Sequence, residues 1–248
     1  MTALVAPARL DIGSLPNTAT RLGSGRPSPP TEGAHRAAWA SYYRGLGMAL
    51  CAIPAGTKGP TAKGWPEGDE DPAHWEAHPL DGLGVVLDPS RLVSWDLDAL
   101  PETRELFATL GLDVDTLTAG AVLVRGNPLR LRALFRVPAG LELTLHKLVW
   151  PPRDPTKPTD HPDGKAVTIF ELRAGPGVQD VLPPTIHPDT HRPYEWVRPP
   201  WELDAPLAEL PAELIELGSN QKQVIHVISR SPAHQHDNST VRARRRGE

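Results

Sequence analysis

The sequence has little cysteine and no long hydrophobic run, and both absences restrict its function. One cysteine, Cys51, stands among 248 residues, which excludes a disulfide framework and any zinc site built from cysteines. No segment approaches the roughly 18 continuous apolar residues of a membrane-spanning helix. The N-terminus also lacks the basic and apolar regions of a signal peptide. We therefore expect a soluble, cytoplasmic protein that is not associated with a membrane.

Charge and composition divide the chain into three parts. The net charge of −4 gives no overall attraction to nucleic acid, although basic residues outnumber acidic ones between residues 121 and 173. Both ends are rich in small and polar residues and lack a sustained apolar period. We predict a flexible N-terminal segment over residues 1–32, a folded domain over 33–217 and a disordered basic tail over 218–248.

The apolar pattern of the middle part predicts more strand than helix. Residues 34–50 have helical spacing, 101–111 have proline first and glycine last, and 206–217 predict a closing helix. The short connections between strands predict an α/β (α+β) fold with a mostly antiparallel sheet. The expected strands are 50–55, 83–88, 91–98, 121–126, 130–138, 166–173, 178–183 and 193–197.

The stretch RLVSWDLD, residues 91–98, ends an apolar strand with two carboxylates. Because side chains alternate along a strand, Asp96 and Asp98 share one face, where they repel each other unless a cation lies between them. Glu171 lies near the end of another apolar strand and could complete an oxygen-rich site suited to Mg²⁺ or Mn²⁺. The spacing alone leaves open whether the acids are only the solvated ends of strands.

Basic residues on neighbouring segments are candidates for phosphate binding. Arg130 and Arg132 alternate on one strand face, which suits a triphosphate or a nucleic-acid backbone and equally suits a solvent-exposed surface. Arg173 and His187 flank a segment rich in glycine and proline, which could approach a ligand through its backbone or form an ordinary long turn.

Two other motifs are incomplete. The loop GTKGPTAKGW has glycines at phosphate-loop spacing, but Trp65 stands where the lysine should be. Two pairs of histidines stand four residues apart, in HWEAH and HPDTH. In HWEAH the glutamate follows the tryptophan, whereas in the metalloprotease motif it follows the first histidine. In HPDTH, Pro188 prevents a regular helix. We expect neither a phosphate loop nor a zinc site.

Four segments in this order resemble the bifunctional DNA primase/polymerase domain of plasmids, phages and integrated elements, within the archaeo-eukaryotic primase superfamily. They are IPAGTKGPTAKGWPE, GVVL before VSWDLDA, FELRAG, and VLPPTIHPDTHRPYEW, and the resemblance covers about residues 40–198. VSWDLDA is similar to the family's acid-x-acid motif and FELRAG to its third motif. The resemblance implies a primase-like catalytic core over 33–217, with a mostly antiparallel sheet flanked by helices.

The resemblance also implies residue roles. Asp96, Asp98 and Glu171 would be catalytic and bind two Mg²⁺ or Mn²⁺ ions that carry the triphosphate of an incoming nucleotide. The family's second motif usually contains a histidine after a small residue, and this chain has NPLRLRALFRV in that region. The phosphate-binding role therefore falls to Arg130 or Arg132. The nucleotide-binding set implied in this way is Arg130, Arg132, Arg173 and His187.

The implied function is a metal-dependent DNA primase/DNA polymerase. It would transfer nucleotides from NTP or dNTP to a 3′-hydroxyl on a single-stranded DNA template, in replication of a plasmid, phage or integrated element. A separate replicative helicase is a candidate partner, because proteins of this type commonly continue into a helicase domain. Two alternatives stay open: a catalytically decayed DNA-binding module of the same fold, and a metal-dependent phosphodiesterase.

Overall fold

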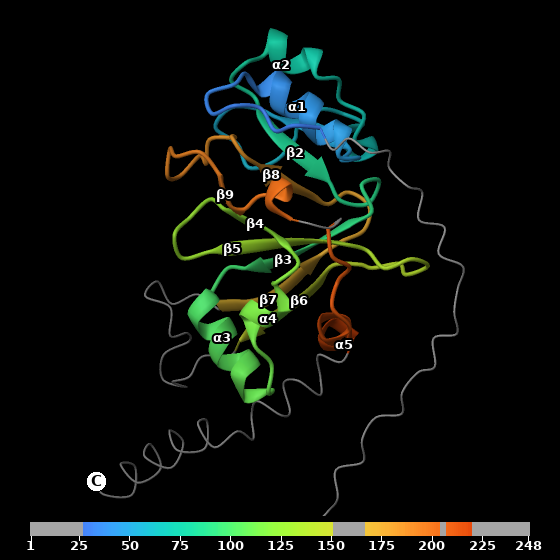
Figure 1. The fold of residues 1–248 in the computed structure, drawn as a ribbon, viewed down its shortest axis with the longest axis vertical. Helices are drawn as coiled ribbons and strands as arrows, with labels where there is room; N and C mark the ends of the chain where they lie inside the picture. The colour runs from blue at the N-terminus through green and yellow to red at the C-terminus, as the bar shows by residue number, and fades with distance from the viewer. Residues whose placement is uncertain (1–26, 151–166, 204–206, 220–248) are drawn as a thin grey trace, which may run out of the picture.

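A computed structural model describes residues 27–150, 167–203 and 207–219, which form two β-sheets with helices at both ends. In Figure 1 the helices α1 and α2 lie at the top, the smaller sheet lies below them, and the larger sheet separates it from α3, α4 and α5. Within these described ranges, no helix is long and apolar enough to cross a membrane.

The smaller sheet has three antiparallel strands in the order β1-β2-β8. Every residue of the central strand β2 is buried, because helices cover one side of this sheet and the larger sheet lies on the other. The elements of this half are α1 (Arg36–Gly45), β1 (Leu50–Ile53), the short 3₁₀ helix η1 (Trp65–Glu67), α2 (Ala73–Ala77), β2 (Gly82–Val86) and β8 (Gln179–Leu182).

The larger sheet has six strands in the order β6-β7-β3-β5-β4-β9, and all neighbouring strands are antiparallel. Its strands are β3 (Leu92–Leu97), β4 (Val122–Arg125), β5 (Leu131–Arg136), β6 (His146–Trp150), β7 (Val167–Arg173) and β9 (Glu195–Arg198). The remaining helices are α3 (Leu100–Thr109), α4 (Val114–Leu117), the 3₁₀ helix η2 (Pro200–Glu202) and α5 (Ala212–Ser219).

Two apolar cores lie on opposite faces of the larger sheet. On the helix side, Trp95 of β3 packs against Phe107 of α3, with ring centroids 5.0 Å apart, and against Phe170 of β7. On the other side, Leu134 of β5 belongs to a core shared with Val85 of the smaller sheet and with α1. Alternation along the strands therefore supplies one side chain to each core in turn.

The structure confirms the α+β class with antiparallel sheets, and each strand expected from the pattern has a counterpart. The predicted closing helix begins only at Ala212, because Pro211 cannot lie in the interior of a helix; residues 207–211 are not helical. The sequence pattern missed β6, α2 and α4, which are short. Most of the proposed flexible segment 1–32 and of the tail 218–248 lies outside the described residues.

Candidate active site

Three carboxylates meet where β3 and β7 lie side by side. The register pairs Asp96 of β3 directly with Glu171 of β7, and Asp98 follows one residue after the end of β3. One oxygen from each of Asp96, Asp98 and Glu171 lies within 4.8 Å of the other two. The pairing of β3 with β7, which the sequence did not reveal, thus brings the third acid to the first two.

Asp96 and Glu171 are buried, which makes the mutual repulsion of the acids costly. Asp96 is only 8% exposed. Burial raises its pKa to about 6, Arg132 opposes the shift, and Asp98 and Asp180 add to it. A cluster of three oxygen ligands suits a hard divalent cation such as Mg²⁺ or Mn²⁺. These three residues could hold such an ion, and its charge would favour their ionised forms.

Cationic side chains surround the acid cluster. Arg130 Nη1 lies 3.0 Å from Asp98 Oδ1, and Arg132 Nη2 lies 3.5 Å from Asp96 Oδ2. On the other side of the cluster, Lys147 Nζ lies 3.3 Å from Glu171 Oε2, and Arg173 Nη1 lies 3.8 Å from Glu171 Oε1. Each acid therefore has a cationic partner on an adjacent strand or turn.

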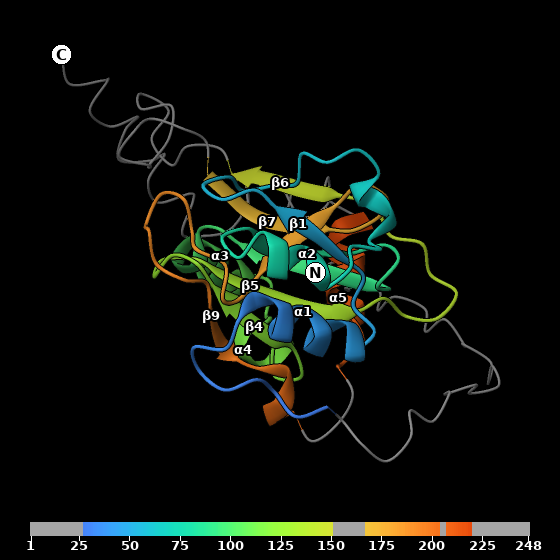
Figure 2. The ribbon, with the colours of Figure 1, turned by 90° about the horizontal axis from the view of Figure 1, so that it is seen from above.

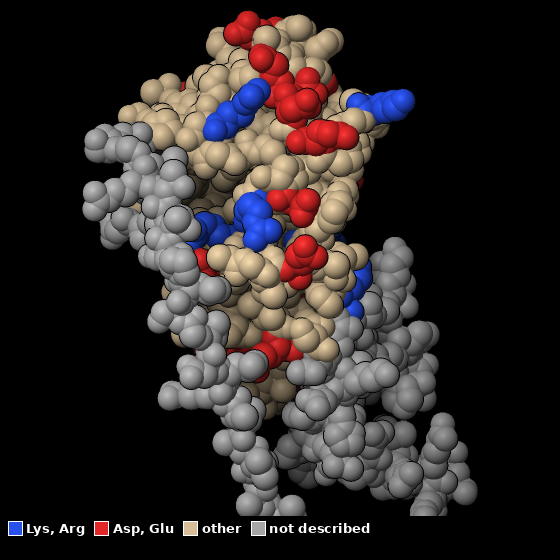
Figure 3. Space-filling model, turned by 90° about the vertical axis from the view of Figure 1, so that its right-hand side faces the viewer, with Lys and Arg blue, Asp and Glu red and all other residues tan. Residues whose placement is uncertain are grey.

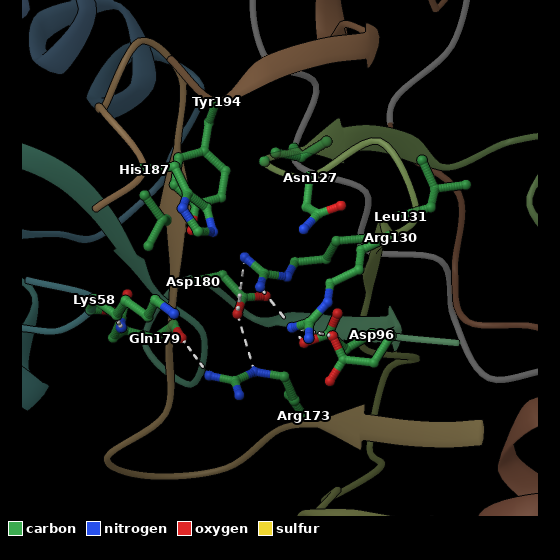
Figure 4. Close-up of a pocket in the computed structure, with 15 residues that line it drawn as sticks. Lys58, Asp96, Asn127, Arg130, Leu131, Arg173, Gln179, Asp180, His187 and Tyr194 are labelled. Atoms are coloured by element: carbon green, nitrogen blue, oxygen red, sulfur yellow. Dashed lines mark hydrogen bonds and ion pairs between the residues drawn. The ribbon is translucent and has the colours of Figure 1, made fainter. Parts of the chain in front are cut away.

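The acids open into a pocket of about 200 Å³ between the two sheets (Figure 4). Asp96, Asp98, Arg130, Arg132, Arg173 and His187, all singled out from the sequence, line this pocket. Glu171 is not part of the lining but lies opposite Asp96 in the strand pair. The structure thus brings all seven candidate residues into one region.

The histidine of the pocket is oriented by its own loop. His187 Nδ1 accepts hydrogen bonds from the backbone N–H groups of Asp189 and Thr190, at 3.1 and 3.3 Å. These donors assign the neutral tautomer, in which Nε2 carries the proton and is a hydrogen-bond donor. Burial, together with Lys58, lowers the pKa of His187, which also favours the neutral ring.

Several pocket residues were missed by sequence reasoning. Lys58 forms an ion pair with Asp189, and Tyr194 packs on His187 with ring centroids 5.2 Å apart. Asp180 of β8 lies across the pocket from the acid cluster and is 1% exposed. The available signal for Asp180 was a lone acid in the apolar strand QDVL, since a buried carboxylate requires cationic or hydrogen-bonding partners.

The surface charge of the described residues is unevenly distributed. On the face drawn in Figure 3, acidic side chains gather over the end of the molecule that carries α1 and α2, where lysine and arginine side chains also lie, and basic and acidic side chains are mixed at mid-height.

The match to a family model covers this region of the chain. Residues 40–213 match the family model described as bifunctional DNA primase/polymerase, N-terminal. No curated protein matches the chain. The match covers more than half of the sequence and includes the acid cluster and every residue that lines the pocket. The chain therefore belongs to the bifunctional DNA primase/polymerase N-terminal family, and this membership indicates primase/polymerase activity on nucleic-acid and nucleotide substrates.

Proposed function

We propose that this protein is a metal-dependent DNA primase/polymerase that adds nucleotides from NTP or dNTP to a 3′-hydroxyl on a single-stranded DNA template. The observation that carries the proposal is the meeting of Asp96, Asp98 and Glu171 within 4.8 Å, beside an arginine-lined pocket. Acids alone would suit any divalent-metal site. The adjoining arginines add the affinity for phosphate that a nucleotide substrate requires.

Asp96, Asp98 and Glu171 would hold two Mg²⁺ or Mn²⁺ ions. Bound there, the ions would supply Lewis-acid chemistry, favouring ionisation of the primer hydroxyl and stabilising charge on the departing pyrophosphate. The carboxylates would hold the positive charge of the ions at the edge of the pocket, next to strands β5 and β7. Their role is therefore to bring the reacting oxygen and the phosphate together with little reorganisation.

The basic side chains would bind the triphosphate. Arg130 is half-exposed at the pocket rim, whereas Arg132 lies deep in the pocket. Although burial opposes it, the carboxylates of Asp180 and Asp96 raise the pKa of Arg132, so its guanidinium stays charged. The neutral ring of His187 would donate a hydrogen bond from Nε2–H to a phosphate oxygen. Arg173 completes this set from β7.

The proposed setting is cytoplasmic replication of a plasmid, phage or integrated element, in cooperation with a separate replicative helicase. Membership of the primase/polymerase family supports this setting. Single-stranded DNA would be the template.

The test is primer synthesis and extension on single-stranded DNA with labelled NTP or dNTP, in Mg²⁺ or Mn²⁺. We expect Asp96→Asn and Asp98→Asn each to lower product formation by at least roughly a hundredfold, because each removes a charged metal ligand. The matched control is Asp115→Asn, which removes an exposed carboxylate paired with Arg104, remote from the pocket. We expect this variant to retain wild-type activity.

Three outcomes would oppose the proposal. Full activity in folded Asp96→Asn and Asp98→Asn would show that these acids are not the metal ligands. Metal-dependent degradation of labelled DNA without synthesis would identify a phosphodiesterase. DNA binding without any product from the wild-type protein, under either metal and with either nucleotide class, would identify a catalytically decayed module.

A further inference from the structure

A buried carboxylate on the smaller sheet joins the two arginines that lie on either side of Asp96. Asp180 Oδ1 is 3.0 Å from Arg173 Nε and 3.5 Å from Arg132 Nη1. These arginines belong to β7 and β5, the two strands that flank β3 in the larger sheet. In Figure 4, a dashed line joins Asp180 to the guanidinium group of Arg173. One acid of β8 therefore contacts both arginine-bearing strands across the pocket.

Asp180 is held by charge rather than by a network of hydrogen bonds. Its side chain is 1% exposed, and neither carboxylate oxygen has a partner of hydrogen-bond geometry among the described residues. Burying a carboxylate is unfavourable unless cations compensate it, and here Arg132 and Arg173 are those cations. Burying this carboxylate therefore costs free energy of folding. Among the described residues, its only ion pairs are with Arg132 and Arg173 of the candidate active site.

Asp180 does not extend the acid cluster that could hold a metal. Among the described residues, the group with converging ligand oxygens consists of Asp96, Asp98 and Glu171 alone. The guanidinium groups of Arg132 and Arg173 are the direct neighbours of Asp180. Apart from the direct effect of its charge on Asp96, its contacts with the candidate active site therefore pass through these arginines.

The same two arginines also approach the proposed metal ligands. Arg132 Nη2 lies 3.5 Å from Asp96 and Arg173 Nη1 lies 3.8 Å from Glu171. Strand β8 opposes this attraction at two points, since Arg173 Nη2 also donates to the carbonyl oxygen of Gln179 at 2.8 Å. Without the pull of Asp180, each guanidinium would be free to move toward the acid cluster and form a closer ion pair there.

We propose that Asp180 is a positioning residue for the nucleotide triphosphate. It holds Arg132 and Arg173 between the two sheets and limits their ion pairs with Asp96 and Glu171 to 3.5 and 3.8 Å, so that N–H groups stay directed at the pocket and the acids stay available to metal. This inference rests on the proposed function and deepens it, because it assigns the orientation of the phosphate-binding groups to a residue outside the acid cluster.

The direction in which Asp180→Asn changes the affinity for dNTP distinguishes positioning of the arginines from a purely electrostatic effect of the Asp180 charge. Asp180→Asn keeps the side-chain shape and removes one negative charge near the triphosphate site. If Asp180 acted only through its field, this change would tighten nucleotide binding. If Asp180 positions the arginines, the variant should bind a fluorescent dNTP roughly tenfold more weakly, because oriented charge-assisted hydrogen bonds are lost. Binding is measured with Ca²⁺, so that no turnover is required.

Kinetics supply a second readout in primer extension with Mg²⁺. We expect Asp180→Asn to raise KM for dNTP by a factor similar to that of the binding change, with kcat within roughly threefold of the wild type. A merely structural role would lower the amount of active protein and leave KM unchanged. Asp115→Asn again serves as the control, since it removes an arginine-paired carboxylate outside the pocket.

The variant Asp180→Asn/Arg132→Gln covers the case in which Asp180→Asn does not fold, because it removes both buried charges together. Compared with Arg132→Gln alone, it should bind dNTP more weakly, but by less than roughly tenfold, because only the positioning of Arg173 remains to be lost. Unchanged or tighter dNTP binding by folded Asp180→Asn, or no dNTP binding by the wild type, overturns the inference. A wild type that binds dNTP without making product would refute the proposed function and leave this test intact.

Discussion

Strand β3 presents two faces that are equally buried and chemically opposite. Ser94 and Trp95 are consecutive residues, and each is 0% exposed. Trp95 packs against aromatic rings of α3 and β7, whereas Ser94 lies on the face that carries Asp96 toward the smaller sheet. One strand thus provides apolar packing on one side and an ionic site on the other. A shift of the register by one residue would exchange the two faces, so the apolar side also fixes where the acids point.

The largest expected effect on stability comes from a substitution in the apolar face of β3. Trp95→Ala removes a fully buried indole that contacts Phe107 and Phe170, and we expect the free energy of unfolding to fall by about 3–5 kcal/mol. Urea titration followed by circular dichroism measures the change. Trp65→Ala is the control, because Trp65 lies partly exposed on η1 outside both cores. A loss below about 1 kcal/mol for Trp95→Ala would contradict the packing argument.

The next effect concerns the ionic face in the absence of metal. Burial raises the pKa of Asp96 above its ordinary value of 3.8, to about 6. The folded state therefore binds this proton more tightly, and the stability contributed by the protonated form is lost as the pH rises from about 4 through 6. Asp96→Asn lacks this loss, so in EDTA it should be more stable than the wild type at pH 7.5.

The expected difference is about 2–3 kcal/mol at pH 7.5, since one pKa unit corresponds to about 1.4 kcal/mol, and it should vanish near pH 4. Unfolding free energies of both proteins between pH 4 and pH 8 measure it. A wild type that is the more stable protein at pH 7.5 would show that the ion pair with Arg132 outweighs the cost of burial.

The sequence predicts the two faces of β3 but not the partner opposite its ionic face. Alternation in RLVSWDLD suffices to place Asp96 and Asp98 together. In contrast, β2 and β3 follow each other after a short turn yet belong to different sheets. Within the described residues, β2 pairs with β1 and β8, while β3 pairs with β5 and β7. Those pairings join segments distant in the chain, so no local pattern specifies them.

The same limit explains which site residues were missed. Glu171 could be identified because it lies near the end of an apolar strand and its motif resembles that of a family. Asp180 becomes meaningful only when β8 is placed opposite Arg132 and Arg173. Lys58 likewise reaches the pocket from a loop far earlier in the chain, where its carbonyl accepts a hydrogen bond from Gln179. Such residues are defined by contacts between the two sheets, and composition or spacing cannot supply those contacts.

A smaller effect on stability is expected from filling the space beside Tyr194 in the pocket, on the ionic face of β3. A Cβ atom added at Gly126 would lie 2.3–2.9 Å from ring atoms of Tyr194, so this ring would have to move. We expect Gly126→Ala to cost about 1 kcal/mol of stability and to raise KM for nucleotide, since Tyr194 lines the pocket beside His187. Gly59→Ala is the control, because its Cβ would meet Gln179 at an ordinary 3.6 Å. Equal KM values for the two variants would show that the Tyr194 ring does not shape the nucleotide site.

The smallest expected effect on stability comes from Ser94, the neighbour of Trp95 in β3. The hydroxyl of Ser94 is buried, and no atom of the described residues forms a hydrogen bond with it. Removing a polar group that has no partner also removes its desolvation penalty, so Ser94→Ala should change the free energy of unfolding by less than about 0.5 kcal/mol or increase it. A loss above about 1 kcal/mol would mean that the hydroxyl is satisfied, for example by a buried water molecule. Together with Trp95→Ala, this measurement shows whether equal burial on the two faces of β3 corresponds to unequal contributions to stability, as a strand with one face for packing and one for chemistry requires.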